Sequence, residues 1–126
     1  MTTILIVEDN PANLKLALTV LEHASYEVLH ADNAADGIAT ARRCKPDLIL
    51  MDIQLPGMDG MAATRLLKAD PDTAGIPVVA LTAFAMKGDE ERILAAGCDG
   101  YIAKPFDYKN LLARVDATLH RTGMEK

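Results

Sequence analysis

The chain has 126 residues, half of them hydrophobic and a quarter charged, with a formal net charge of −5. This composition is typical of one soluble globular domain with a single core, and the negative balance disfavours general nucleic-acid binding, which needs a basic surface. The sequence has no apolar run of about 18 residues and no basic, cleavable leader, so we expect a cytoplasmic protein without membrane insertion.

The first part of the chain alternates apolar runs with helical periodicity. Asn10 followed by Pro11 is typical of a helix start, and Asn33 can cap a second helix that Lys45 and Pro46 stop. The pattern predicts, in order, a strand over residues 3–7, a helix from 11 to about 24, a strand over 26–31 and a helix between Asn33 and Lys45.

The second part continues the same alternation. Asp107 can cap the last helix, and Gly97 can end the one before it. The pattern predicts a strand over residues 48–52, a helix over 60–69, a strand over 76–81 that leads into Thr82, a helix over 86–96, a strand over 100–103 and a last helix after Asp107. We expect one domain over residues 1–122 and a short tail over 123–126.

Five strands that alternate with five helices indicate an α/β fold. Such alternation favours a parallel sheet with helices on both faces, because right-handed crossovers leave few other arrangements. The flavodoxin-like strand order 2-1-3-4-5, a (βα)5 three-layer sandwich, fits five such units.

Polar side chains follow four of the predicted strands, where the carboxyl ends of parallel strands meet at one edge. Each has an ordinary explanation alone, such as a loop-opening acid or a surface lysine, but their convergence at one edge favours a site. The residues are Glu8, Asp9, Asp52, Thr82 and Lys104.

Three carboxylates at one edge need positive charge. Two like charges about 4 Å apart repel by about 4 kcal/mol at an effective dielectric of 20, and Lys104 supplies one cation. Oxygen ligands favour Mg²⁺, with Mn²⁺ as an alternative, whereas no His or Cys is near these strand ends to hold zinc. A carboxylate such as Asp52 beside Mg²⁺ can accept a phosphoryl group, with Lys104 and Thr82 as partners of its oxygens.

Four stretches carry a resemblance to a known family. The sequences ILIVEDN at 4–10, DLILMDIQLPGMDG at 47–60, VVALTA at 78–83 and YIAKPF at 101–106 resemble the receiver domain of two-component response regulators. The resemblance covers nearly the whole chain, and residues 81–93 with Gly97 and Cys98 are most similar to single-domain members.

The resemblance implies a role for each site residue. Asp52 would be the phosphoacceptor, Lys104 would bind the phosphoryl group, and Thr82 with Tyr101 would form the switch pair. The implied Mg²⁺ ligands are Asp9, Asp52 and the main-chain carbonyl of Gln54, with Glu8 acting through water. The family also implies a cis peptide bond between Lys104 and Pro105.

The resemblance also implies partners. A histidine kinase or histidine phosphotransferase would donate the phosphoryl group, and the protein would assist its own phosphorylation and dephosphorylation without turning over an external substrate. Because the sequence ends soon after the last helix, we expect output through a protein partner on the fourth helix, fifth strand and fifth helix.

Two other functions share this fold class. An FMN carrier would need an anion-friendly loop after the first strand, where this chain has Glu8 and Asp9. A haloacid-dehalogenase-type phosphatase would need a second acid at Gln54. The remaining chemical candidates, Cys44 and Cys98, are expected to be buried free thiols, because their loops flank strands about 10 Å apart.

Overall fold

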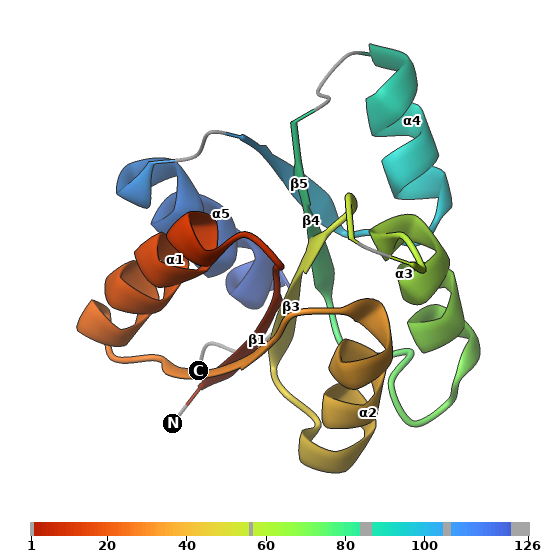
Figure 1. Cartoon of the computed structure of the whole chain (residues 1–126), viewed down its shortest axis with the longest axis horizontal. Coiled ribbons are helices and arrows are strands. Elements are labelled where there is room, and N and C mark those ends of the chain that lie inside the picture. The colour runs from red at the N-terminus through yellow and green to blue at the C-terminus, as the bar shows by residue number, and fades with distance from the viewer. Residues whose placement is uncertain (1, 56, 84–86, 105–106, 122–126) are drawn as a thin grey trace.

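The computed structural model describes residues 2–55, 57–83, 87–104 and 107–121, and this part of the chain alternates strands with helices (Figure 1). The strands are β1 (Thr3–Val7), β2 (Glu27–Ala31), β3 (Leu48–Asp52), β4 (Val78–Thr82) and β5 (Gly100–Ala103). The helices are α1 (Pro11–His23), α2 (Ala34–Cys44), α3 (Gly60–Ala69), α4 (Lys87–Ala95) and α5 (Tyr108–Arg121).

The strands form one parallel sheet in the order β2-β1-β3-β4-β5. This confirms the flavodoxin-like α/β fold predicted from the sequence. Every residue of the central strands β3 and β4 is buried, because helices cover both sheet faces.

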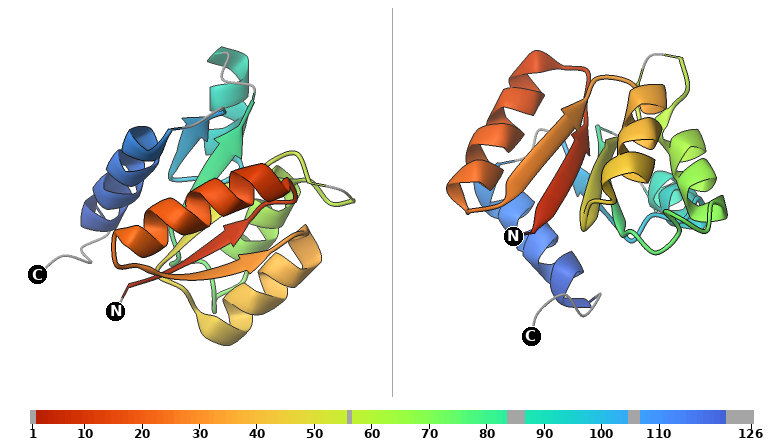
Figure 2. Two further views of the ribbon diagram at one scale, coloured as in Figure 1. Left: turned by 60° about the vertical axis from the view of Figure 1, so that its left-hand side comes forward. Right: turned by 90° about the horizontal axis from the view of Figure 1, so that it is seen from below.

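Two hydrophobic cores lie on opposite faces of the sheet. Helices α1 and α5 cover one face and contribute Ala17, Leu21 and Leu111 to its core. On the other face, α2, α3 and α4 contribute Ile38, Leu67 and Ile93. Figure 2 shows the three layers from two further directions.

Side-chain caps begin four of the helices, and Asp107 caps α5 as the sequence predicts, because its carboxylate accepts a hydrogen bond from the backbone N–H of Asn110. The amide oxygen of Asn10 accepts hydrogen bonds from the backbone N–H groups of Ala12 and Asn13. The side chains of Asn33 and Asp59 accept from the first turns of α2 and α3 in the same way. These short caps place the strand-to-helix loops directly above the carboxyl ends of the strands.

Three details differ from the sequence prediction. Strand β2 begins one residue later than expected, at Glu27. Strand β4 begins at Val78 instead of Ile76, because the backbone N–H of Ile76 still bonds back to Thr73 in the preceding turn. Cys44 is exposed, so the expectation of two buried thiols was wrong for it, whereas Cys98 is buried and both are free.

Several expectations fall on residues outside the described ranges. They are the start of the fourth helix at Met86, the cis bond at Pro105 and the tail at 123–126. None of the helices in the described part of the chain combines the length and the apolar character that a membrane span needs.

Candidate functional site

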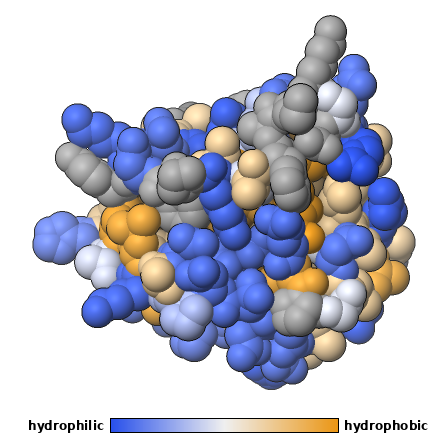
Figure 3. Space-filling model, turned by 45° about the horizontal axis from the view of Figure 1, so that its top comes forward, coloured by the Kyte–Doolittle hydropathy of each residue, from blue (hydrophilic) through white to orange (hydrophobic). Residues whose placement is uncertain are grey.

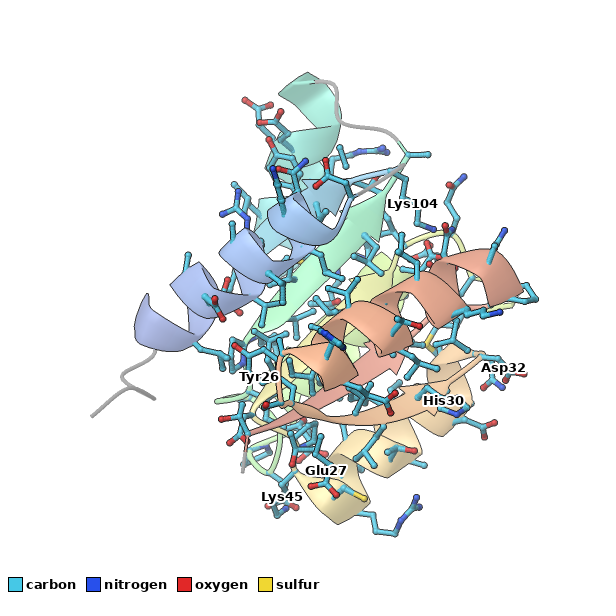
Figure 4. All side chains as sticks on the ribbon, turned by 90° about the vertical axis from the view of Figure 1, so that its left-hand side faces the viewer. Tyr26, Glu27, His30, Asp32, Lys45 and Lys104 are labelled. Atoms are coloured by element: carbon cyan, nitrogen blue, oxygen red, sulfur yellow. The ribbon has the colours of Figure 1, made fainter. Side chains whose placement is uncertain are left out.

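The structure brings an acid from β1, an acid from β3 and a lysine from β5 together at the carboxyl edge of the sheet. Glu8 follows β1 and Asp52 ends β3, and the pairing of Val7 with Met51 sets these two strand ends side by side. The Lys104 Nζ atom lies 2.9 Å from Oδ2 of Asp52 and 3.2 Å from Oε1 of Glu8. Figure 4 shows Lys104 at this end of the sheet.

Backbone groups of the adjoining loops hold both buried carboxylates. The Gln54 N–H donates to Oδ1 of Asp52 at 2.9 Å, and the Asn10 N–H donates to Oε2 of Glu8 at 3.1 Å. Glu8 and Asp52 are only 0% and 1% exposed. Each carboxylate therefore keeps one oxygen fixed by its own loop and presents the other to the Lys104 ammonium.

The site holds more negative than positive charge. Carboxylate oxygens of Glu8, Asp9 and Asp52 all lie within 4.8 Å of one another, and the described neighbours include one ammonium, that of Lys104. Burial, together with a hydrogen bond and charge repulsion from Asp52, raises the pKa of Glu8 to about 7. Burial alone would lower the pKa of Lys104, but its contacts with Asp52 and Glu8 outweigh burial and raise it.

The donor set fits a hard divalent cation. Oε1 of Glu8 is buried and has no hydrogen-bond donor among the described residues, although it lies near the Lys104 ammonium. Asp9 is exposed, so its carboxylate can meet an ion arriving from solvent. The three carboxylates, together with the buried Oε1 of Glu8 that accepts no hydrogen bond from a described residue, match the oxygen ligands that Mg²⁺ prefers.

Thr82 lies beside this cluster, whereas Tyr101 lies farther along β5. Thr82 is buried, and its carbonyl accepts a 2.7 Å hydrogen bond from the backbone N–H of Lys104. Tyr101 is half-buried and packs against the core on the α2–α3 face. The Glu90 carboxylate on α4 bonds the Tyr101 hydroxyl and raises its pKa.

Sequence reasoning missed a second role of Gly60, which it treated as a chain breaker. A Cβ atom at Gly60 would lie 2.2 Å from the backbone oxygen of Asp52, much closer than any carbon can approach. The Gly60 N–H also donates to the carbonyl of Ile53 at 3.1 Å. Glycine therefore allows α3 to begin directly against the end of β3. The only signal in the sequence was its place just after the helix cap at Asp59.

The face at this end of the molecule is largely hydrophilic, with apolar side chains in separate patches (Figure 3). Among exposed apolar residues, Met58 follows β3 in the loop to α3, and its side chain is 38% exposed.

Comparisons with known proteins agree with this geometry. The sequence profile of the response regulator receiver domain matches residues 4–116. The polar-differentiation response regulator DivK of Brucella anthropi is 45% identical over 117 residues, which are 93% of this chain and 95% of the relative. DivK of Brucella ovis is 44% identical over the same shares.

Solved structures show the same likeness. The receiver domain of the sensor histidine kinase PA1611 from Pseudomonas aeruginosa, with magnesium in its active site cleft, is 37% identical with a TM-score of 0.87, covering 94% of this chain and 98% of that one. The chemotaxis response regulator CheY4 of Vibrio cholerae is 25% identical with a TM-score of 0.90, covering 94% and 99%.

Proposed function

This chain belongs to the response regulator receiver domain family, and from that premise we propose that Asp52 accepts a phosphoryl group from a phosphohistidine donor. The observation that carries the proposal is the buried Asp52 carboxylate, which contacts Lys104 and lies beside two further acids. The donor would be a sensor histidine kinase or a histidine phosphotransferase. We place the protein in the cytoplasm, where such kinases use ATP.

The residues of the site have separate tasks in this transfer. A carboxylate oxygen of Asp52 attacks phosphorus, the P–N bond of the donor breaks, and its electron pair leaves with the imidazole. The Lys104 ammonium would stabilise the negative charge that develops on the phosphoryl oxygens, and the Thr82 hydroxyl would donate a hydrogen bond to one of them. We expect no turnover of an external phosphate ester, and the phosphoryl group on Asp52 would later pass to water.

The acidic cluster would hold Mg²⁺, or Mn²⁺ in its place. Asp9, Asp52 and the Gln54 carbonyl would be direct ligands, with Glu8 acting through water. When bound, the ion would supply the positive charge that Lys104 alone does not.

The other two functions of this fold class have less support. The loop after β1 carries two acids that repel an FMN phosphate, and the place of a phosphatase's second acid is taken by Gln54, whose side chain is exposed. Neither the acids after β1 nor Gln54 conflicts with a phosphoacceptor role for Asp52.

Labelling with acetyl phosphate and Mg²⁺ tests the assignment. Wild-type protein should gain one phosphoryl group, and Asp52→Asn should gain none, as measured by intact mass spectrometry. The matched control is Asp99→Asn, which alters a different carboxylate in contact with a lysine and should label like wild type. Equal labelling of Asp52→Asn and wild type would refute Asp52 as the acceptor.

We further propose that Thr82 and Tyr101 relay phosphorylation to a protein partner on the face formed by α4, β5 and α5. If the Thr82 hydroxyl moves to the phosphoryl group, the half-exposed Tyr101 ring can turn into the space behind it. Burying such a ring is favourable by about 1.5–3 kcal/mol, whereas a nearly complete two-state shift needs about 5.5. The contacts of Thr82 and Lys104 must therefore supply the rest.

Beryllofluoride, which mimics the phosphoryl group, can test this relay without a known partner. It should change the NMR signals of the Tyr101 ring in wild type and in Thr73→Ala, which removes a buried hydroxyl elsewhere. The change should be lost in Thr82→Ala, although that variant still binds beryllofluoride. A Tyr101 response that persists in Thr82→Ala would show that the signal leaves the site by another route.

A further inference from the structure

Strand β2 is an edge strand with one row of backbone groups facing outward. It pairs with β1, where Glu27 donates its N–H to Thr2 and the Ala31 carbonyl accepts from Glu8. Because a strand alternates direction at every residue, Val28 and His30 direct their N–H and C=O groups away from β1. Figure 4 looks onto this edge, which runs between α1 and α2.

Apart from the exposed charge of Glu27 at its start, this edge lacks several devices that usually prevent strand addition. β2 contains neither Pro nor Lys, and its pairing with β1 continues without a bulge from Glu27 to Ala31. Its aliphatic side chains, Val28 and Leu29, are half-buried on opposite faces. The other edge strand, β5, has only four residues, and the Arg114 side chain lies 3.5 Å from where a Gly100 Cβ would be.

Negative and positive side chains lie beside opposite ends of β2. A groove of about 450 Å³ borders the edge. It is lined by Leu14, His30, Ala31, Asp32, Asp36, Thr40 and Arg43. Helix α2 runs back along the strand, so Asp32 and Asp36 lie near its carboxyl end, whereas Arg43 and Lys45 lie near its amino end, where Figure 4 shows Glu27 and Lys45.

We propose that β2 pairs antiparallel with β2 of a second copy of this chain, about a two-fold axis at Leu29. Val28 of each copy then exchanges hydrogen bonds with His30 of the other, and Leu29 faces Leu29 across the axis. Glu27 lies opposite Ala31, so no like charges stand directly opposite within the paired strands. The two sheets continue as one.

Charge complementarity favours a second copy over an unrelated extended peptide. In the two-fold arrangement the α2 helices lie antiparallel, which brings Asp36 of one copy towards Arg43 of the other, twice. Thr40 lies between these two residues on α2 and falls near the axis. An isologous contact needs a surface that is complementary to itself. Helix α2 provides it, because its acidic end and its basic end lie at opposite ends of β2.

Cysteine cross-linking tests the register directly, with the exposed thiol removed by Cys44→Ser in every variant. Leu29→Cys should form a disulfide-linked dimer under mild oxidation, because Cα atoms of such a non-hydrogen-bonded pair lie about 4.5 Å apart. Val28→Cys, the matched control, faces His30 of the other copy and should give little dimer. Equal cross-linking of the two variants, or none in Leu29→Cys, would overturn the proposal.

Sedimentation equilibrium of chains without added cysteines tests the same contact reversibly. The average mass of wild type should rise with concentration from that of one chain towards that of two. His30→Pro removes an outward N–H and should abolish the rise, whereas His30→Thr keeps that N–H and should retain it.

Charge reversal separates a second copy from other occupants. Asp36→Arg and Arg43→Glu should each weaken association, and the double variant should restore it. A wild type that stays monomeric at every concentration, or a double variant no better than the singles, would overturn self-association and leave the edge to another extended segment.

Discussion

Two lysine–carboxylate clusters lie at opposite ends of the sheet, and they differ in charge balance. Near the amino end of β4, the Lys68 ammonium donates to the Ile76 carbonyl at 2.8 Å and lies 3.2 Å from Asp99. Asp99 also accepts a hydrogen bond from the backbone N–H of Val78 on β4, and it forms an ion pair with the Lys68 ammonium. At the carboxyl end, Lys104 contacts both Glu8 and Asp52, with Asp9 close by.

The difference distinguishes a structural ion pair from the cluster that we propose to be reactive. The Lys68–Asp99 pair is neutral and partly exposed, with 23% and 38% of the two side chains accessible, so it adds modestly to stability. The Lys104 cluster is buried and carries surplus negative charge, which raises the free energy of the metal-free fold. Such surplus negative charge favours binding of a cation. The bound cation would then offset the negative charge of a phosphoryl group.

The largest effect should come from replacing each lysine by methionine. Without metal at pH 8, Lys104→Met leaves buried carboxylates without a cation and should lower the free energy of unfolding by about 3–5 kcal/mol. Lys68→Met loses one partly exposed ion pair and its carbonyl contacts, and should cost about 1–2 kcal/mol. Urea denaturation in EDTA measures both losses of unfolding free energy. Equal losses in the two variants would contradict the proposed difference between the two clusters.

A smaller effect should appear in the pH dependence of stability. The pKa of Glu8 is raised from 4.5 to about 7 in the fold, so its favourable contribution is complete below pH 4.5 and is lost as pH rises through 7. The loss amounts to at most about 3 kcal/mol. Glu8→Gln keeps a neutral side chain at every pH, so its stability relative to wild type should rise between pH 5 and pH 8 in EDTA.

Urea denaturation at several pH values measures this difference. Asp99→Asn is the matched control, because Asp99 lies in the balanced cluster and should not reproduce the trend. If the difference in unfolding free energy between Glu8→Gln and wild type stays constant across this range, the pKa of Glu8 is not raised in the fold.

Much of the fold and the membership of the site could be predicted from the sequence. β3 and α3 begin and end at the predicted residues, because a continuous buried run meets a loop rich in Pro and Gly and a helix cap follows. The convergence of Glu8, Asp52 and Lys104 followed from the parallel sheet alone. Their roles in phosphoryl transfer stay predictions.

What the sequence could not supply depends on packing between distant segments. The complete burial of Glu8 arises from the elements around it, and the close approach of Gly60 to Asp52 arises from where α3 starts. The exposure of Cys44 follows from its place as the last residue of α2, next to Arg43 and Lys45, whose side chains are in solvent. No single periodicity encodes these three facts.

The carboxyl-end cluster holds surplus negative charge, and we expect a divalent cation to relieve it. Thermal unfolding with and without Mg²⁺ tests it most directly, on wild type and Asp9→Asn. We expect Mg²⁺ to raise the Tm of wild type, and we expect Asp9→Asn to be more stable than wild type in EDTA but to gain less from Mg²⁺. A wild-type Tm that ignores Mg²⁺, together with an Asp9→Asn variant that is less stable in EDTA, would contradict it.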